Sequence, residues 1–446
     1  MPERRSALLD RVGTGASLLF AVSAGVSVAA ASVALGLAVI ACSLSAPARR
    51  ALLQDDAAKM ALLLAAYLLV RAVWAAVEIP ETRAKQLTDT VRWLYPLGFL
   101  AVAWWVAHPR PKASLALALA LAGLLVGMLL SVDWGSLESF QVQARTGFKL
   151  KITFFGLAAG TATLGLLLFA PRILHGGRWW PAWLGLPLWL VALGLSLYGL
   201  VATRSRGGWL AAAVVIPPTL VVRYRGAGRA DLRDRRMALA GLAALVLLAG
   251  VLAPSAVSTV AQRLSEEAPA GHAVLAGELD EIPESSIAFR VHVQRFGLES
   301  WLARPLVGWG PGSTEYLIAH SDDPSLLHPV AGGGRAWMDH LHNTYLEALV
   351  RLGLVGTLLL LALLWRIFRA VHGAYRSGGM PRDHAVFAAG WTGLLAIWSL
   401  FDFRLLHYDV RYYWIILAGV AYSFSVRGSR PAQAAGRPVG DTGGRM

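Results

Sequence analysis

Long uninterrupted runs of apolar residues are the feature that most constrains how this chain can fold. A helix needs about 20 apolar residues to cross a bilayer whose core is about 30 Å thick. Only 15% of the 446 residues are charged, whereas soluble domains carry about 25%. These values disfavour a soluble enzyme and predict an all-α, polytopic membrane protein. Eleven such runs are present, at 13–42, 57–79, 91–107, 113–132, 150–170, 180–202, 208–222, 237–260, 345–365, 384–401 and 410–426.

The distribution of basic residues predicts the topology. Short cytoplasmic loops collect Lys and Arg, and the segments 223–236 and 366–382 hold six and four Arg. Counting spans back from these segments puts the basic N-terminus inside only if the run 13–42 crosses twice. We therefore predict that this run divides near Gly25 into two short helices. The result is about twelve transmembrane helices with both termini in the cytoplasm.

This count divides the chain into four segments. Transmembrane helices one to nine occupy 1–260, and helices ten to twelve occupy 345–426. Between them, 261–344 forms a large loop on the outer side of the membrane, and a loop of this size is usually functional. The resemblance described below implies that this loop is periplasmic and carries catalytic elements. Apolar periodicity over 286–302 predicts an amphipathic helix against the membrane, with a soluble helical cap as the alternative. The tail 427–446, rich in Gly, Pro and Arg, is expected to be a disordered cytoplasmic segment.

The predicted outer loops break the charge rule because they are rich in cations. The formal net charge of +14 could suggest nucleic acid in another setting, but these cations adjoin apolar runs, as loops facing anionic lipid do. A cationic outer vestibule suits an anionic substrate, and snorkelling to outer-leaflet phosphates is the alternative. The cations include Arg83, Lys85, Arg92, Arg145, Lys149, Lys151, Arg204, Arg206, Arg290, Arg295, Arg304, Arg335, Arg404 and Arg411.

A short turn between two runs, 203–209, contains Arg204 and Arg206 followed by two glycines. If the turn is extended, side chains at i and i+2 point the same way, so both guanidinium groups would face one site. Arginine binds phosphate through two parallel hydrogen bonds and never loses its charge at working pH. The turn is therefore a candidate phosphate site.

A second polar constellation, 339–347, directly precedes the run at 345–365. In one interpretation it is only the start of a helix, with Asn343 as N-cap and Glu347 in the first turns. In the other, His342 is a general base, because the positive end of the helix dipole disfavours imidazolium. A metal site at His340 and His342 is possible on an extended backbone, but a third ligand at a fixed spacing is missing.

These residues resemble a family. His342 and Asn343, nine residues and then Gly353-Leu-Val-Gly356 are similar to the His-Asn, spacer and Gly-x-x-Gly pattern of the bacterial O-antigen ligase and polymerase superfamily. The Ser205-Arg206-Gly207 turn looks like that family's Ser-Arg-Gly turn between two spans. The stretch 286–310 resembles the Arg-containing helix and following Pro-x-x-Gly-x-Gly segment of its periplasmic loop. The motifs cover roughly 203–357.

The resemblance implies an inverting, metal-independent glycosyltransferase of the GT-C type that needs no cofactor. Its donor is a polysaccharide on undecaprenyl diphosphate, and an acceptor hydroxyl attacks the anomeric carbon. His342 would remove the hydroxyl proton, and Arg206 and Arg290 would hold the diphosphate leaving group. Arg204 would assist. The remaining expected substrate contacts are Arg83, Lys85, Arg145, Asn343 and Tyr345.

Within the family, the surplus of outer cations favours an O-antigen ligase of the bacterial inner membrane, with a lipid A-core acceptor. A repeat-unit polymerase and a protein O-oligosaccharyltransferase share the motifs and remain alternatives. An anionic lipid transporter is the alternative from another class, although it would usually show internal repeats and broken helices. Arg71 lies in the middle of the apolar run 57–79. It is expected to face the bundle, where a neighbouring helix would supply its hydrogen-bond partners.

Overall fold

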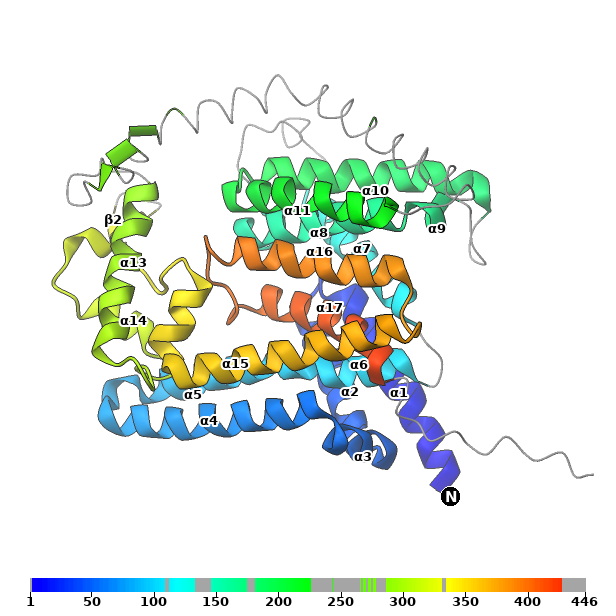
Figure 1. Ribbon diagram of the computed structural model, residues 1–446, viewed down its shortest axis with the longest axis horizontal. Coiled ribbons are helices and arrows are strands. Elements are labelled where there is room, and N and C mark those ends of the chain that lie inside the picture. The colour runs from blue at the N-terminus through cyan, green and yellow to red at the C-terminus, as the bar shows by residue number, and fades with distance from the viewer. Residues whose placement is uncertain are drawn as a thin grey trace, which may run out of the picture.

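A computed structural model describes residues 2–108, 112–132, 146–174, 181–225, 286–330 and 334–426, together with a few isolated positions between 243 and 277. The predicted span at 237–260, Arg145 and the tail 427–446 lie outside the described residues, as does most of 261–285. Within the described part, helices run side by side in a bundle (Figure 1). The predicted helical fold class is confirmed, apart from one short two-stranded hairpin.

The N-terminal run folds into two helices, as its charges predict. Helix α1 ends at Ser23 and α2 begins at Val28, with Ser27 as the N-cap. A Cβ at Gly123 of α7 would overlap the Val22 carbonyl, so small residues allow α1 and α7 to pack closely. The first elements are α1 (Pro2–Ser23), α2 (Val28–Leu44), α3 (Ala46–Gln54), α4 (Asp56–Glu78), a 3-10 turn (Pro80–Thr82), α5 (Arg83–Leu94), a second 3-10 turn (Tyr95–Gly98) and α6 (Phe99–Ala107).

One predicted span is wrong in its form. The run 91–107 is not a single helix, because a 3-10 turn at Tyr95–Gly98 separates α5 from α6. Pro96 lies in this turn, and proline cannot supply the backbone N–H that a continuous α-helix needs there. Helix α5 also begins earlier than the run, at Arg83, and carries polar residues that the bundle buries, among them Gln86 and Asp89.

The middle of the chain contributes the helices drawn in cyan to green in Figure 1. Helices α8 and α10 pack against one another, and α11 packs on both α8 and α16. Ser205 caps α11 by accepting a hydrogen bond from Gly208 N. These helices are α7 (Ala113–Leu129), α8 (Ile152–Leu168), α9 (Ala170–Leu174), α10 (Ala182–Ala202) and α11 (Arg206–Tyr224).

The described part of the large loop lies at one end of the bundle, and the N-terminus lies toward the other (Figure 1). The helix predicted at 286–302 is confirmed as α13 (Ser286–Ala303). It packs with α15 and carries Val293 into a small hydrophobic core of its own with Ile318, Leu341 and Val350. The other elements of this cap are α14 (Thr314–Ala319), a 3-10 turn (Pro324–Leu326) and the antiparallel strands β1 (Leu327–Val330) and β2 (Gly334–Trp337).

The last three helices are α15 (Thr344–Arg376), α16 (Arg382–Trp398) and α17 (Tyr408–Val426). Helix α15 is kinked at Gly353, where φ is 64°. In the described residues, α4, α10, α11 and α15 are long and apolar enough to cross a membrane, and α2 with α3 forms a further pair bent by 85°. The protein is therefore a helical membrane protein, while the count of twelve spans and the orientation remain predictions.

Candidate active site

Two loops far apart in sequence meet at the start of α15. One loop precedes α15 and carries His340 and His342; the other joins α16 to α17 and carries Asp402. Thr344 ties them together, because its backbone N–H donates to Ser399 O (2.8 Å) and its hydroxyl to Asp402 O (2.8 Å). The histidines are thus fixed against a carboxylate from another part of the chain.

Asp402 lies between the two histidine rings. Its Oδ1 is 3.3 Å from Nε2 of His340 and 3.6 Å from Nδ1 of His342. The other nitrogen of His340, Nδ1, is 2.5 Å from Oδ1 of Asp339. We call His340, His342 and Asp402 the histidine site. His340 and Asp402 are buried, whereas the His342 side chain is 15% exposed, so His342 is the member that a substrate can reach.

The histidine site is strained and incompletely hydrogen-bonded. His342 has φ 54°, in the left-handed region that residues with a Cβ seldom adopt. Among the described residues, Nδ1 of His342 and Oδ2 of Asp402 are buried atoms without a hydrogen-bond partner. Such features cost free energy and cluster at functional sites. Their coincidence at one residue pair favours a functional role.

The surroundings move the two histidines in opposite directions. Burial lowers the pKa of His342 to about 4, and repulsion by His340 and Arg290 adds to this effect, while Asp402 opposes it. Burial would also lower the pKa of His340, but its contacts with Asp339 and Asp402 outweigh burial and raise the pKa to about 9. At neutral pH the ring of His342 is therefore neutral and can accept a proton.

The carboxylates beside these rings keep their negative charge. Burial alone would raise the pKa of Asp402, but its contacts with the two histidines and the charge of Arg404 hold it well below the usual range. The hydrogen bond from His340 lowers the pKa of Asp339 as well. The site therefore holds anionic carboxylates that orient the histidine rings.

The structure brings the two predicted arginine segments to this site. Arg290 lies on α13 close enough to His342 to lower its pKa, and the neighbouring Phe289 ring meets the His342 ring edge-on at 6.1 Å. The first turn of α11 lies against the loop that carries Asp402, since a Cβ at Gly207 would lie 3.2 Å from the Phe401 side chain. Arg206 thus starts α11 beside the loop that carries Asp402.

The predicted extended turn around Arg204 is wrong. Arg204 has φ 47°, in the left-handed region, and Arg206 is the first residue of α11. Ser205 is the N-cap of α11, so the helix begins directly after it and the turn is too short to be extended. The backbone at 204–206 is therefore not extended, so the i, i+2 rule for strands does not apply to the side chains of Arg204 and Arg206.

The interpretation of 343–347 as the start of a helix is confirmed. The side-chain oxygen of Asn343 accepts hydrogen bonds from Tyr345 N (3.0 Å) and Leu346 N (3.1 Å). The Tyr345 hydroxyl donates to Ala396 O (2.9 Å), which joins α15 to α16. The expected contacts of Asn343 and Tyr345 with substrate remain predictions.

The outer cations on α5 have protein partners. Lys85 forms an ion pair with Glu315 of the cap, and Nε of Arg83 donates to Ala76 O (3.1 Å). Their expected role in substrate binding remains a prediction, as does that of Arg145, which lies outside the described residues.

A buried ion network holds the histidine loop from the opposite side. Arg351 donates to Glu347 Oε1 (2.6 Å) and to Asp89 Oδ2 (2.8 Å), and all three side chains are buried. The second oxygen of Glu347 accepts from Leu341 N (2.8 Å), between the two histidines. We call Asp89, Glu347 and Arg351 the arginine clamp. It fixes the histidine loop to α15 and α5.

The glycine motifs allow the cap to dock on the kink of α15. Trp309 N donates to Val350 O (2.8 Å), and Leu354 N donates to Pro305 O (2.8 Å). Gly308 and Gly353 face one another at positive φ, and a Cβ on either would overlap the backbone of the other. The motifs of 305–310 and 353–356 are therefore the two halves of one backbone contact.

Arg71 supports the same contact. Its Nε donates to Val307 O (3.0 Å) and its Nη2 to Gly308 O (2.7 Å), and Glu78 lies 3.4 Å from Nη2. The sequence predicted satisfaction by a neighbouring helix. Instead, the main partners of Arg71 are two backbone carbonyls of the cap. Arg71 therefore links α4 to the cap.

Three side chains could hold a metal ion by residue type. In the described part of the chain, one ligand atom from each member of the histidine site lies within 4.8 Å of the others. The third ligand that the sequence lacked is Asp402, which comes from a distant loop. A search for a carboxylate to orient His342 could have found it, because it follows Phe401 in a short polar loop between two apolar runs.

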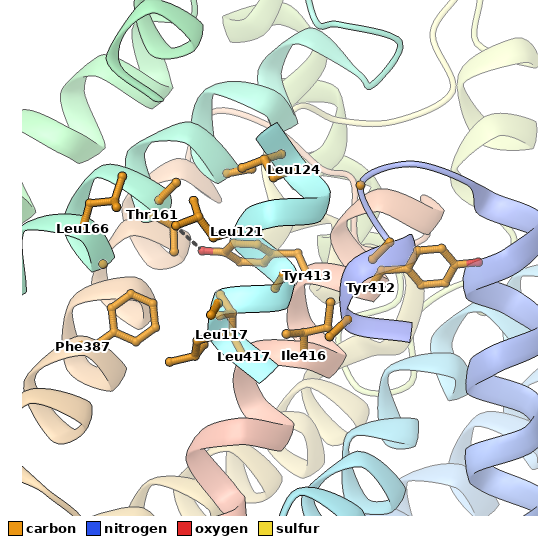
Figure 2. A pocket seen from close by; sticks show the side chains of 18 of the residues that line it. Leu117, Leu121, Leu124, Thr161, Leu166, Phe387, Tyr412, Tyr413, Ile416 and Leu417 are labelled. Atoms are coloured by element: carbon orange, nitrogen blue, oxygen red, sulfur yellow. Dashed lines mark hydrogen bonds between the residues drawn. The ribbon is translucent and has the colours of Figure 1, made fainter. Parts of the chain in front are cut away.

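An apolar cavity lies elsewhere in the bundle, between α1, α7, α8, α16 and α17 (Figure 2). Its volume is about 260 Å³. Thr161 and Tyr413, whose hydroxyl groups are hydrogen-bonded to each other (2.7 Å), both line it. None of the predicted site residues lines it. The cavity can accommodate hydrocarbon, whereas the proton-transfer groups gather at the histidine site.

Together, the bundle and the histidine site define a helical membrane protein with a buried histidine and carboxylate site at one end. Residues 191–361 match the Wzy_C family, described as O-antigen ligase. Residues 191–361 are therefore similar to that family, and the resemblance stated from the sequence is confirmed over this region. A comparison with curated proteins gave no match. The match supports a glycosyl-transfer enzyme without distinguishing which reaction it performs.

Proposed function

We propose that this protein is an O-antigen ligase of the bacterial inner membrane. It transfers polysaccharide from undecaprenyl diphosphate to a sugar hydroxyl of lipid A-core oligosaccharide on the periplasmic side, with inversion and without a metal. The observation that carries the proposal is the neutral, partly exposed His342 held against buried Asp402, within the matched region and beside Arg290.

His342 is the general base in this proposal. Its Nδ1 faces Asp402, which keeps the ring proton on that nitrogen and leaves Nε2 to accept the proton of the acceptor hydroxyl. The carboxylate also stabilises the imidazolium that forms as the hydroxyl attacks the anomeric carbon. A histidine and carboxylate pair performs the same orienting task in other enzymes that activate a hydroxyl.

Arg206 and Arg290 hold the diphosphate leaving group. Negative charge grows on this group as the glycosidic bond breaks, and fixed guanidinium groups stabilise that charge in the transition state. Arg290 lies on α13 near His342, and Arg206 begins α11 beside the loop that carries Asp402. In this proposal, donor and acceptor meet between these segments. Arg204 assists, and Arg83, Lys85 and Arg145 are assigned to the phosphorylated acceptor.

Reconstitution with undecaprenyl-diphosphate polysaccharide and a panel of acceptors tests the proposal. Transfer to lipid A-core oligosaccharide is expected, and transfer only to a second undecaprenyl-linked glycan would identify a polymerase instead. Arg206→Lys and Arg290→Lys should each lose most activity, because lysine cannot form two parallel hydrogen bonds to phosphate. Arg304→Lys is the control, since Arg304 pairs with Glu78 and lies over Trp309. Equal small losses in all three would contradict the assigned roles.

Deletion of the gene separates the two reactions in cells. A ligase deletion should leave lipopolysaccharide without O-antigen while long undecaprenyl-linked polymer accumulates. A single repeat unit attached to the core would show that ligation is intact and that this protein is the polymerase.

A further inference from the structure

We propose that the histidine site binds a transition-metal ion such as Zn²⁺, and that the bound ion inhibits the enzyme. The geometry of three side chains supports the binding of the ion, and this part is independent of the proposed function. The inhibition rests on the proposed role of His342.

The spacing of the ligand atoms fits a tetrahedral ion. Zinc bonds of about 2.0 to 2.2 Å place neighbouring ligand atoms about 3.3 to 3.6 Å apart. The observed separations from Asp402 Oδ1 are 3.3 Å to His340 Nε2 and 3.6 Å to His342 Nδ1. A tetrahedral ion bound by three protein ligands keeps one position for water. All three ligand atoms lie within 4.8 Å of one another, and coordination releases the Nε2 proton of His340 to solvent.

The surroundings supply the features of a built metal site. Ligating histidines usually donate their second ring nitrogen to a carboxylate, and His340 Nδ1 already lies 2.5 Å from Asp339. The Asp402 side chain is buried, and its Oδ2 lacks a hydrogen-bond partner among the described residues. Imidazole and carboxylate are ligands that Zn²⁺ accepts.

Nearby arginines set a limit on the affinity. Arg404 Nε lies 3.6 Å from Asp402 Oδ2, and the charge of Arg290 acts on His342. The carboxylates of Asp339 and Asp402 offset these two cations. We therefore expect reversible binding that a chelator removes, in contrast to a permanently occupied structural site.

A metal ion at this position blocks proton transfer by a simple route. Coordination takes the lone pair of His342 Nδ1, so the single proton of the neutral ring must reside on Nε2. That nitrogen then cannot accept the proton of an acceptor hydroxyl. The ion does not coordinate Arg206 or Arg290, which are proposed to bind the diphosphate of the donor. Inhibition should therefore lower turnover while donor binding persists.

Zinc binding to the purified full-length protein tests the site without substrate. Chelator-treated protein is titrated with Zn²⁺ against a coloured zinc indicator, and wild type should bind one ion more per chain than Asp402→Asn or His340→Ala. Asp339→Asn should weaken binding about 10- to 100-fold, as losses of such supporting carboxylates do. Because Asp339 is 66% exposed, this variant keeps the test informative if a buried substitution disrupts folding.

His407→Ala is the matched control. His407 Nδ1 lies 2.7 Å from Asp409 near the same loop, but neither residue belongs to the histidine site. Its zinc stoichiometry should equal that of wild type. Equal stoichiometry in wild type, Asp402→Asn and His340→Ala, with unchanged affinity in Asp339→Asn, would overturn the site.

Transfer assays test the inhibition separately. Zn²⁺ should lower turnover and excess chelator should restore it, whereas Mg²⁺ at the same concentration should have no effect. Zinc bound at the site without loss of turnover would overturn the inhibition and the base role of His342, but not the site. Failure of wild type to transfer polysaccharide would overturn the proposed function while the zinc titration still decides on the site.

Discussion

The arginine clamp and the histidine site lie on either side of Leu341 and are built in opposite ways. Every charged member of the clamp has a partner of opposite charge within 2.8 Å. In the histidine site, Asp402 lies between two rings, His342 has a strained backbone, and Oδ2 of Asp402 has no hydrogen-bond partner within the part of the chain that the structure describes. Buried charge that is fully paired fixes structure, whereas strain and unmet hydrogen bonds persist where chemistry needs them.

Loss of the base is the largest expected effect and tests the functional half of this comparison. His342→Ala should lower the transfer rate about 10²- to 10⁴-fold, because it removes the group proposed to accept the hydroxyl proton. The measurement is turnover in proteoliposomes, with the fold checked by size-exclusion chromatography. His320→Ala is the control, since His320 lies exposed at the end of α14. Wild-type turnover in His342→Ala would end the assignment.

Breaking the clamp should affect stability first. Arg351→Met leaves Glu347 buried without its cation and Asp89 with only the more exposed Arg92, which costs about 3 to 5 kcal/mol of unfolding free energy. Denaturant unfolding in detergent measures this loss. Arg366→Met removes an exposed pair with Asp56 and should cost about 1 kcal/mol or less. Similar losses in both variants would mean that the clamp is no more structural than a surface pair.

The kink of α15 tests whether the cap must dock closely for the two clusters to align. Gly353→Ala places a Cβ at φ 64°, against the backbone of Gly308 and Leu306, and should cost about 1 to 3 kcal/mol. Gly373→Ala in the same helix meets no atom within 4 Å and should instead stabilise the helix by about 0.5 to 1 kcal/mol. Thermal unfolding of both variants compares them. A neutral Gly353→Ala would show that the docking contact tolerates a side chain.

The sequence located the helix start at Asn343 and the glycine motifs, but it did not identify the distant residues that pack beside them. A local pattern signals an N-cap such as Asn343, a divided helix near Gly25 and a histidine before a helix, since each depends on adjacent residues. Asp402 and Asp89 come from loops and helices distant in sequence, and only tertiary packing places them beside His342 and Arg351. The same limit explains why a span at 91–107 was predicted as one helix, because the polar residues of α5 are buried by contacts that periodicity does not register.

The smallest expected effect concerns an exposed ion pair next to the clamp. Lys85→Met removes the contact with Glu315 and should change the unfolding free energy by about 1 kcal/mol or less. If Lys85 also binds the acceptor, the KM for acceptor should rise while turnover is retained. Lys59→Met, which removes an exposed pair with Asp56, is the control. An unchanged KM would leave Lys85 with the structural role alone.

The position of Asp402 also constrains when this enzyme can become active during its synthesis. The carboxylate that orients His342 belongs to the loop before the last helix, α17. A ribosome must therefore translate nearly the whole described chain, and the membrane must receive its final helices, before the histidines meet their partner. The proposed catalytic pair is therefore complete only after the loop before α17 has been synthesised.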